Sequence, residues 1–282
     1  MPYCEVEKGV RLYYETFGHG QPIVFVHGGA MSHEFWEQQV YALADSFRVV
    51  AYDLRGHGES DKPAHGHTFD RFVQDLEALI EHLRLDAVSL VCHAVGGYVG
   101  ILYALRNPER LARLVLVSSS ARFLGADEER GGFSNEFWDD YRRGLARDKI
   151  GASAQLIERV FYYKDPGPET RQAVLNIMLQ WPLYALRLLG RDAERINFED
   201  QLPRINTPTL VIHGRHDRKQ RFSGARFLCD KLPNARLMIF EESAHLPPLE
   251  EVERFNRAVT DFMQQETPTR QDATAPARKL VT

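Results

Sequence analysis

The sequence is short of several features that would assign it to particular classes of protein. It has three cysteines in 282 residues, too few for a complete disulfide framework, so we expect a reducing compartment. It has no uninterrupted apolar run near the roughly 18 residues that a membrane-spanning helix needs, and its N-terminus lacks the basic and apolar regions of a signal peptide. We therefore expect a cytoplasmic protein that does not associate with membranes.

An excess of charge of one sign is also lacking. The chain has 35 lysines and arginines against 39 aspartates and glutamates, a net charge of −4 that does not favour nucleic acid. Gly96 and Gly97 lack the further spaced glycines of a dinucleotide motif. Two histidine pairs lie in turns with no third ligand at suitable spacing: His65 with His67, and His213 with His216. We expect a small-molecule partner, no cofactor and no bound metal, and the sequence leaves a homo-oligomer open.

What the sequence does contain is an alternation of short strand-like and longer helix-like patterns. A hydrophobic content of 44% suffices for one large core. The alternation is typical of right-handed βαβ units and a mainly parallel sheet. Residues 10–17 are predicted to form an edge strand. Central strands are predicted at residues 23–26, 47–52, 88–92, 114–117, 209–212 and 235–240, and amphipathic helices at residues 35–44, 69–85, 95–106 and 252–263.

The strand pattern stops for about eighty residues in the second half of the chain. We expect residues 121–200 to form a helical cap, between a first core part at residues 1–120 and a second at 201–265. Residues 266–282 are polar and aperiodic, so we expect a disordered tail. The cap is rich in aromatic rings, and three of them are predicted to contact a ligand: Trp138, Tyr162 and Trp181.

The most consequential absence is a hydroxyl group at the end of one predicted strand. Residues 87–98 match the nucleophile-elbow pattern G-x-S-x-G, in which a strand enters a helix through a turn of small residues. Cys92 stands at the first glycine and Ala94 at the serine, with Gly96 at the second glycine. A methyl group cannot attack a carbonyl, and Cys92 is the alternative nucleophile nearby. His93, beside the elbow, is predicted to line the crevice as a substrate-binding residue or to hydrogen-bond the backbone there.

Two glycine-containing motifs follow other predicted strands. The first is His27-Gly28-Gly29, where the N–H of Gly29 is a candidate donor to a reacting oxyanion. The N–H of Val95, which opens the helix after the elbow, is the second candidate donor. Residues 53–60, D-L-R-G-H-G-E-S, need special turns and contain charges that pin a loop, so we expect a structural role there.

An acid and a histidine complete the set, each just past a predicted strand. Asp217 follows residues 209–212, and His245 follows residues 235–240. An acid that fixes the imidazole tautomer, followed by the imidazole itself, gives the chain order nucleophile, acid, base. We therefore predict that position 94, Asp217 and His245 form one catalytic group.

Together these residues resemble the α/β-hydrolase superfamily, and the resemblance covers about residues 10–264. It implies a doubly wound, mainly parallel eight-stranded sheet flanked by helices, with a helical cap inserted after the sixth strand. It also implies a triad at position 94, Asp217 and His245. The motifs look most similar to the esterase, haloperoxidase-like and carbon–carbon-bond hydrolase branch. The substrate implied is an apolar or aromatic small-molecule ester, lactone or related acyl or ketone compound.

Ala94 leaves three interpretations open. In the first, alanine replaces the serine of an otherwise complete hydrolase site, as a deliberate change made to trap substrate would, and the chain is nearly inactive. In the second, the alanine is native and His245, oriented by Asp217, is the general base of a lyase, a cyclase or a direct attack by water. In the third, the chain is a non-catalytic ligand receptor, although binding alone requires neither Asp217 nor His245.

Overall fold

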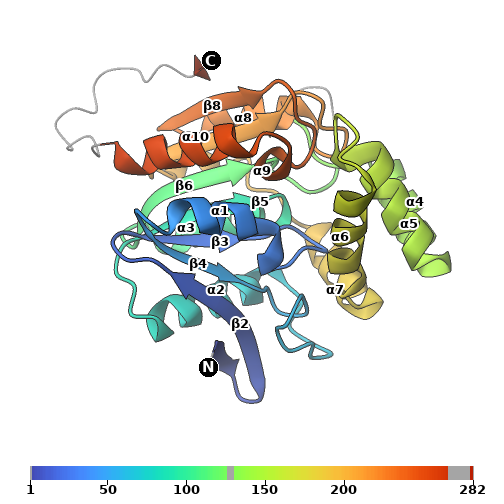
Figure 1. The fold of residues 1–282 in the computed structure, drawn as a ribbon, viewed down its shortest axis with the longest axis horizontal. Helices are drawn as coiled ribbons and strands as arrows, with labels where there is room; N and C mark the ends of the chain where they lie inside the picture. The colour runs from blue at the N-terminus through green and yellow to red at the C-terminus, as the bar shows by residue number, and fades with distance from the viewer. Residues whose placement is uncertain (1, 126–129, 266–279, 282) are drawn as a thin grey trace.

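One sheet organises the structure, a computed structural model that describes residues 2–125, 130–265 and 280–281 (Figure 1). Its eight main strands lie in the spatial order β1-β2-β4-β3-β5-β6-β7-β8, with β1 and β2 antiparallel to their neighbours and the other strands parallel. The strands are β1 (Tyr3–Glu7), β2 (Val10–Phe17), β3 (Pro22–Val26), β4 (Arg48–Tyr52), β5 (Val88–His93), β6 (Leu111–Val117), β7 (Thr209–Gly214) and β8 (Ala235–Phe240). The doubly wound, mainly parallel, eight-stranded sheet predicted from the sequence is confirmed.

The two edges of the sheet differ from the prediction. Residues 10–17 form β2 as expected, but β1 pairs outside them and is the true edge. Only Cys4 is fully buried in β1, so the period-two pattern that marks a strand is almost absent from it. At the other edge, Leu280–Val281 form a two-residue strand, β9, that pairs with β8. The rest of the predicted tail, residues 266–279 and 282, lies outside the described residues.

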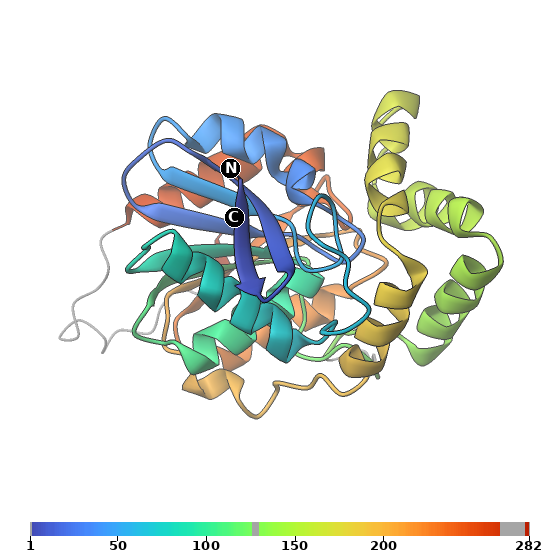
Figure 2. The ribbon, with the colours of Figure 1, turned by 90° about the horizontal axis from the view of Figure 1, so that it is seen from below.

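Helices cover both faces of the sheet. The 3-10 turn His33–Trp36 and helix α1 (Glu37–Leu43) pack with α10 (Val252–Gln264) on one face, while α2 (Phe69–His82) and α3 (Val95–Arg106) pack together on the other (Figures 1 and 2). Helix α8 (Phe222–Lys231) packs on β7 and β8, and the short α9 (Pro247–Glu250) precedes α10. Helix α2 ends earlier than predicted because Arg84 adopts a φ of 51°. No helix in the described ranges is long and apolar enough to cross a membrane.

The cap is an excursion between β6 and β7. It contains α4 (Asn135–Arg147), α5 (Lys149–Leu156), a π-helical turn (Ile157–Phe161), α6 (Pro168–Leu179) and α7 (Leu183–Ala193), and the chain returns to the core through the 3-10 turn Leu202–Arg204. Figure 1 places the cap helices beside the end of the sheet toward which the β6 arrow points. Because parallel strands present their carboxyl ends there, the loops that follow β3, β5, β7 and β8 meet under the cap.

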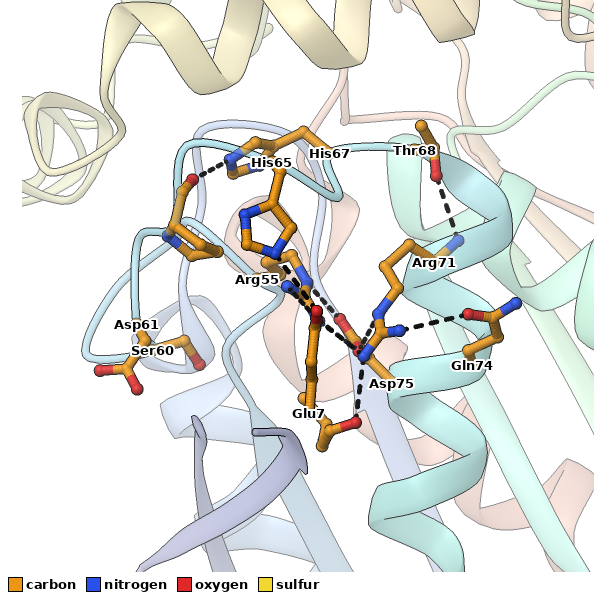
Figure 3. A network of polar contacts seen from close by, with 12 residues as sticks. Glu7, Arg55, Ser60, Asp61, His65, His67, Thr68, Arg71, Gln74 and Asp75 are labelled. Atoms are coloured by element: carbon orange, nitrogen blue, oxygen red, sulfur yellow. Dashed lines mark hydrogen bonds and ion pairs between the residues drawn. The ribbon is translucent and has the colours of Figure 1, made fainter. Parts of the chain in front are cut away.

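A buried ionic network fixes the edge of the core to the loop at residues 53–60 (Figure 3). The fully buried Arg55 side chain donates two hydrogen bonds of 2.8 Å to the carboxylate of Asp75 on α2. Glu7 at the end of β1 lies 3.0 Å from Arg55 and 3.1 Å from Arg71, so it joins the strand to the same cluster. The network therefore holds a strand, a loop and a helix together.

Candidate active site

The turn between β5 and α3 holds Ala94 in a strained conformation. Ala94 has φ 46° and ψ −108°, a region that L-residues rarely occupy and that costs about 1–3 kcal/mol. Its N–H donates to the carbonyl of Val117 on β6 at 2.9 Å, which fixes the turn. Gly96 must be glycine, because a Cβ there would lie 2.5 Å from the carbonyl oxygen of Val26. The strand-to-helix turn is thus held in place although no hydroxyl projects from it.

Asp217 and His245, predicted as acid and base, meet behind this turn. The Nδ1 of His245 lies 2.8 Å from Oδ2 of Asp217, and both side chains are fully buried. The other carboxylate oxygen accepts from the backbone N–H groups of Lys219 at 2.8 Å and Gln220 at 2.9 Å. Since a carboxylate only accepts, Nδ1 carries the proton and Nε2 carries the lone pair. That Nε2 is buried and has no hydrogen-bond partner among the described residues.

The electrostatic environment keeps this imidazole neutral. Burial lowers the pKa of His245 to about 4, although the Asp217 carboxylate opposes the shift. Burial acts to raise the pKa of Asp217, but its attraction to His245 and their hydrogen bond outweigh burial and leave that pKa below its ordinary value. Near neutral pH the pair therefore consists of an ionised carboxylate and a neutral imidazole with a free Nε2, the state required of a general base.

His93 connects the elbow to the His245 loop. Its Nε2–H donates to the backbone carbonyl of His245 at 3.0 Å, and the two rings lie 4.9 Å apart. The ring also packs 4.7 Å from Phe35 in the core. Because Ala94 is the next residue, these contacts bring the elbow and the histidine loop together. His93 therefore holds the two loops together through a backbone hydrogen bond, the second of the two roles predicted for it.

The turn after β3 lies against the start of α3. The Nε2 of His27 accepts from the N–H of Leu54 at 3.0 Å, so Nδ1–H donates to the carbonyl of Gly28 at 2.7 Å and fixes the turn. A Cβ on Gly29 would lie 3.1 Å from a methyl of Val95, so a larger residue here would require the Val95 side chain to move by a few tenths of an ångström. Val95 is the first residue of α3 and its N–H has no partner within the helix. In the described part of the chain, neither this amide nor that of Gly29 donates a hydrogen bond.

A small cavity of about 40 Å³ lies where the core meets the cap. Gly29 and Val95 line it from the core side. Its aromatic lining consists of Phe69, Phe123, Phe133, Trp138, Tyr141 and Trp181. Trp138 and Trp181, two of the residues predicted to contact a ligand, line this cavity, whereas Tyr162 and His93 are not among the lining residues. Tyr162 packs instead against the hydrophobic core, from the segment that follows the π-helical turn.

Comparison with known proteins identifies the fold. A family model described as the alpha/beta hydrolase fold matches residues 21–252. The chain belongs to this family. It is 32% identical over 263 residues to the AB hydrolase superfamily protein YisY of Bacillus subtilis, and the match covers 92% of this chain and 98% of YisY. It is 30% identical over 276 residues to the non-heme chloroperoxidase CPO-A1 of Kitasatospora aureofaciens, and that match covers 93% of this chain and 99% of the chloroperoxidase.

A solved esterase has the same architecture. The esterase from Exiguobacterium antarcticum matches with a TM-score of 0.88 and 25% sequence identity, and the match covers 93% of this chain and 99% of the esterase. The resemblance to the alpha/beta hydrolase superfamily inferred from the motifs is thus confirmed over nearly the whole chain.

Cys92 is not an alternative nucleophile in this alpha/beta hydrolase fold. The side chain is fully buried in β5, and its sulfur lies 2.7 Å from where a Cβ on Gly100 of α3 would stand. Burial raises the pKa of the Cys92 thiol far above its ordinary value, so the reactive thiolate is not formed near neutral pH. Among the residues that the structure describes, no group of three histidine, cysteine or carboxylate side chains is arranged to hold a metal ion.

Two residues of the site escaped the sequence analysis. Lys219, two residues after Asp217, lines the cavity. Glu250 accepts from the N–H groups of Ala244 at 2.8 Å, of Leu246 at 3.1 Å and of Tyr163 in the cap at 2.7 Å, so it clamps the His245 loop to the cap. Burial raises the pKa of Glu250 to about 7. A lysine in a loop and a glutamate near a helix start are usually solvent-exposed, and no sequence motif marks either one.

Proposed function

We propose that this chain carries the catalytic site of a hydrolase for carboxylic esters, lactones or related acyl or ketone substrates, with alanine at the nucleophile position. The observation that carries the proposal is the buried Nε2 of His245, which has a lone pair and no partner among the described residues. Its other nitrogen is fixed by Asp217. A histidine oriented in this way behind a strained strand-to-helix turn is suited to be the base of an acyl-transfer site that lacks only its nucleophilic hydroxyl.

The roles follow from the geometry with a serine at position 94. Its Oγ would attack the substrate carbonyl while the Nε2 of His245 takes the hydroxyl proton, and Asp217 would stabilise the imidazolium. The N–H groups of Gly29 and Val95 would hold the developing oxyanion. The imidazolium would then donate its proton to the leaving group, and water would cleave the acyl-enzyme with the same histidine as base.

Alanine removes the covalent step and leaves the rest. Loss of the nucleophile from such a triad costs about a million-fold in turnover, while oxyanion binding retains about a thousand-fold over water. In this proposal the chain binds its substrate and hydrolyses it very slowly, as a serine-to-alanine trap does. Trp138 and Trp181 line the cavity and provide apolar faces for an aromatic or aliphatic substrate.

The test is Ala94→Ser, assayed beside the unaltered chain on aryl and alkyl esters, lactones and vinylogous diketones. The expected gain in kcat/KM on at least one class is about a thousand-fold or more. Ala94→Gly is the matched control, because it changes the same side chain without adding a hydroxyl and should gain nothing. Adding His245→Ala to Ala94→Ser should remove the gain. Equal turnover by the alanine and serine forms on every substrate would contradict the proposal.

A second candidate function uses His245 without a nucleophile. The intact, buried pair of His245 and Asp217 favours it, since a neutral imidazole with a free Nε2 suits removal of a proton from an activated carbon or from water. This enzyme would be a lyase, a cyclase or a hydrolase by direct water attack. The unaltered chain would then turn over an enolisable substrate, His245→Ala would abolish the turnover, and Ala94→Ser would not increase it. Tight binding with no product, unchanged in Asp217→Asn, would instead indicate a ligand receptor.

A further inference from the structure

Lys219 places a positive charge at an otherwise apolar and aromatic cavity. It is the one charged residue among the described residues that line this cavity. Its Nζ lies 5.0 Å from the ring centre of Phe161 and 5.9 Å from that of Phe133. Both rings belong to the excursion between β6 and β7, so the ammonium group lies where the Asp217 loop meets the cap.

No carboxylate of the described chain neutralises this ammonium group by contact. Asp217 is the nearest acid in sequence, but one of its oxygens accepts from His245 and the other from two backbone N–H groups. Within the described ranges, the Nζ of Lys219 makes no hydrogen bond or ion pair, only the contacts with the two rings. Burial lowers the pKa of Lys219 to about 8, against the opposing effect of Asp217, so the amine still carries a proton at neutral pH for most of the time.

Four N–H groups of the lining are also available as donors. The indole Nε1 atoms of Trp138 and Trp181 are buried without a partner among the described residues, and an indole N–H can only donate. The backbone N–H groups of Gly29 and Val95 add two more donors. A cavity with four N–H donors and an ammonium group, and no carboxylate among its described lining residues, is complementary to a ligand that brings acceptors and negative charge.

We infer that the cavity takes substrates with an apolar or aromatic body and a carboxylate, and that the carboxylate pairs with Lys219. The inference rests on the proposed function in that it takes this cavity to be the substrate site. It adds a charge requirement that an ester or lactone hydrolase does not otherwise have. Lys219 is then a specificity-determining residue, since it contacts the substrate away from the reacting carbonyl.

Ligand binding to the unaltered full chain tests the inference without requiring turnover. The probes are 4-phenylbutanoate and the neutral 4-phenylbutanamide, which have the same length and the same ring. Their dissociation constants are measured by calorimetry and by the fluorescence of Trp138 and Trp181. Because a charge-assisted hydrogen bond contributes about 1.5–3 kcal/mol, we expect the carboxylate to bind about tenfold or more tightly than the amide.

Substitution of Lys219 should remove that preference and nothing else. In Lys219→Met the ratio of the two dissociation constants should fall to about one, with binding of the amide retained, whereas Lys219→Arg should keep the preference. The matched control is Lys231→Met, because Lys231 also lies over a ring, 5.6 Å from the centre of Phe227, but on α8 and outside the cavity lining. Thermal unfolding of each variant checks that it is folded.

The contrary outcomes are distinct from failure of the proposed function. An unchanged preference in Lys219→Met, no preference in the unaltered chain, or no binding of either probe would each overturn the inference. If Ala94→Ser gains no activity while the carboxylate preference depends on Lys219, the hydrolase proposal fails and the binding site stands. If Ala94→Ser hydrolyses neutral esters and Lys219→Met leaves the carboxylate preference unchanged, the hydrolase proposal stands and the inference about Lys219 fails.

Discussion

Ala94 holds the turn between β5 and α3 in a backbone conformation that a residue with a Cβ rarely adopts. A φ of 46° is unfavourable for any residue with a Cβ, yet the hydrogen bond to Val117 and the close approach of Gly96 to Val26 hold the turn in place. In a chain that only needed to fold, glycine would serve better at this position. The strain therefore does not contribute to the stability of the fold.

This strain predicts that Ala94→Gly stabilises the protein. Removing the Cβ relieves the positive-φ strain, so we expect the free energy of unfolding to rise by about 1 kcal/mol, measured by urea denaturation. Ala146→Gly is the matched control, because Ala146 is exposed within α4. Glycine there should lower the free energy of unfolding by about 1 kcal/mol. A loss of stability in both variants would show that Ala94 is not strained.

The lowered pKa of His245 predicts the pH dependence of both activity and stability. In the Ala94→Ser variant the imidazole should remain an active base below the ordinary histidine pKa of 6.5, so the acidic limb of kcat/KM should fall below that value. The lowered pKa also fixes the direction in which the free energy of unfolding changes with pH. The folded state binds fewer protons than the unfolded chain between pH 6.5 and about 4, so His245 contributes a loss of stability as pH falls through that window.

The control for this pH dependence is His245→Gln, which removes the titrating group. The free energy of unfolding of this variant should decline less steeply between pH 6.5 and 4.5 than that of the unaltered chain. Other buried histidines, including His27 and His93, titrate in both proteins, so the difference between the two curves isolates His245. Parallel curves, or an acidic limb at pH 6.5 or above, would contradict the assignment.

At the scale of single residues, the sequence predicted those whose chemistry is written in a motif. Asp217 and His245 could be predicted because an acid and a histidine followed successive strand-like runs, and the structure joins them at 2.8 Å. Lys219 could not be predicted, because its partial burial depends on Phe161 and Phe133 of a distant segment. For His93 the sequence left two roles open, lining the crevice or bonding to the backbone, and its side chain packs on Phe35 and donates to the His245 backbone.

Among the elements, α2 and the loop at residues 53–60 depend on one buried ion pair. The Arg55 guanidinium is fully buried, and it donates two hydrogen bonds to the carboxylate of Asp75, which lies on α2 (Figure 3). Taking away the carboxylate would leave a buried cation whose remaining partner is the half-exposed Glu7. A charge left in this state costs far more than a surface pair contributes.

We therefore predict that Asp75→Asn lowers the free energy of unfolding by about 3 kcal/mol or more, measured by urea denaturation. Asp70→Asn is the matched control on the same helix, because its pair with Arg106 is largely exposed and contributes about 1 kcal/mol or less. Similar losses in the two variants would mean that the network of Figure 3 does not hold this edge of the core.

Secondary structure could be predicted from the sequence where buried apolar residues recur at the spacing of a helix or a strand. Helix α2 was predicted from residue 69 because its apolar positions repeat at helical spacing, and Thr68 caps it by accepting from the N–H of Arg71 at 3.2 Å. Its end was missed because the positive φ of Arg84 has no marker in a non-glycine residue. The edge strand β1 was missed because only one of its residues is fully buried, which leaves no alternation to detect.

At the scale of the whole molecule, the cavity is formed by segments that lie far apart in the sequence. Its lining combines Gly29 and Val95 from the two turns of the core, Trp138 and Trp181 from the cap, and Lys219 from the loop after β7. The sequence predicted a cap because strands were absent from residues 121–200. Which of its rings face the cavity depends on how α4 and α7 lie on the core, and a single sequence does not encode that arrangement in any local pattern.

The central claim is that position 94 lies in a complete acyl-transfer site from which only a hydroxyl is missing. The most direct measurement is the kcat/KM of Ala94→Ser against that of the unaltered chain on one aryl ester, with mass spectrometry of the peptide that contains position 94. We predict a gain of about a thousand-fold or more and an acyl adduct on that peptide. Equal rates and no adduct across the ester panel would contradict the account.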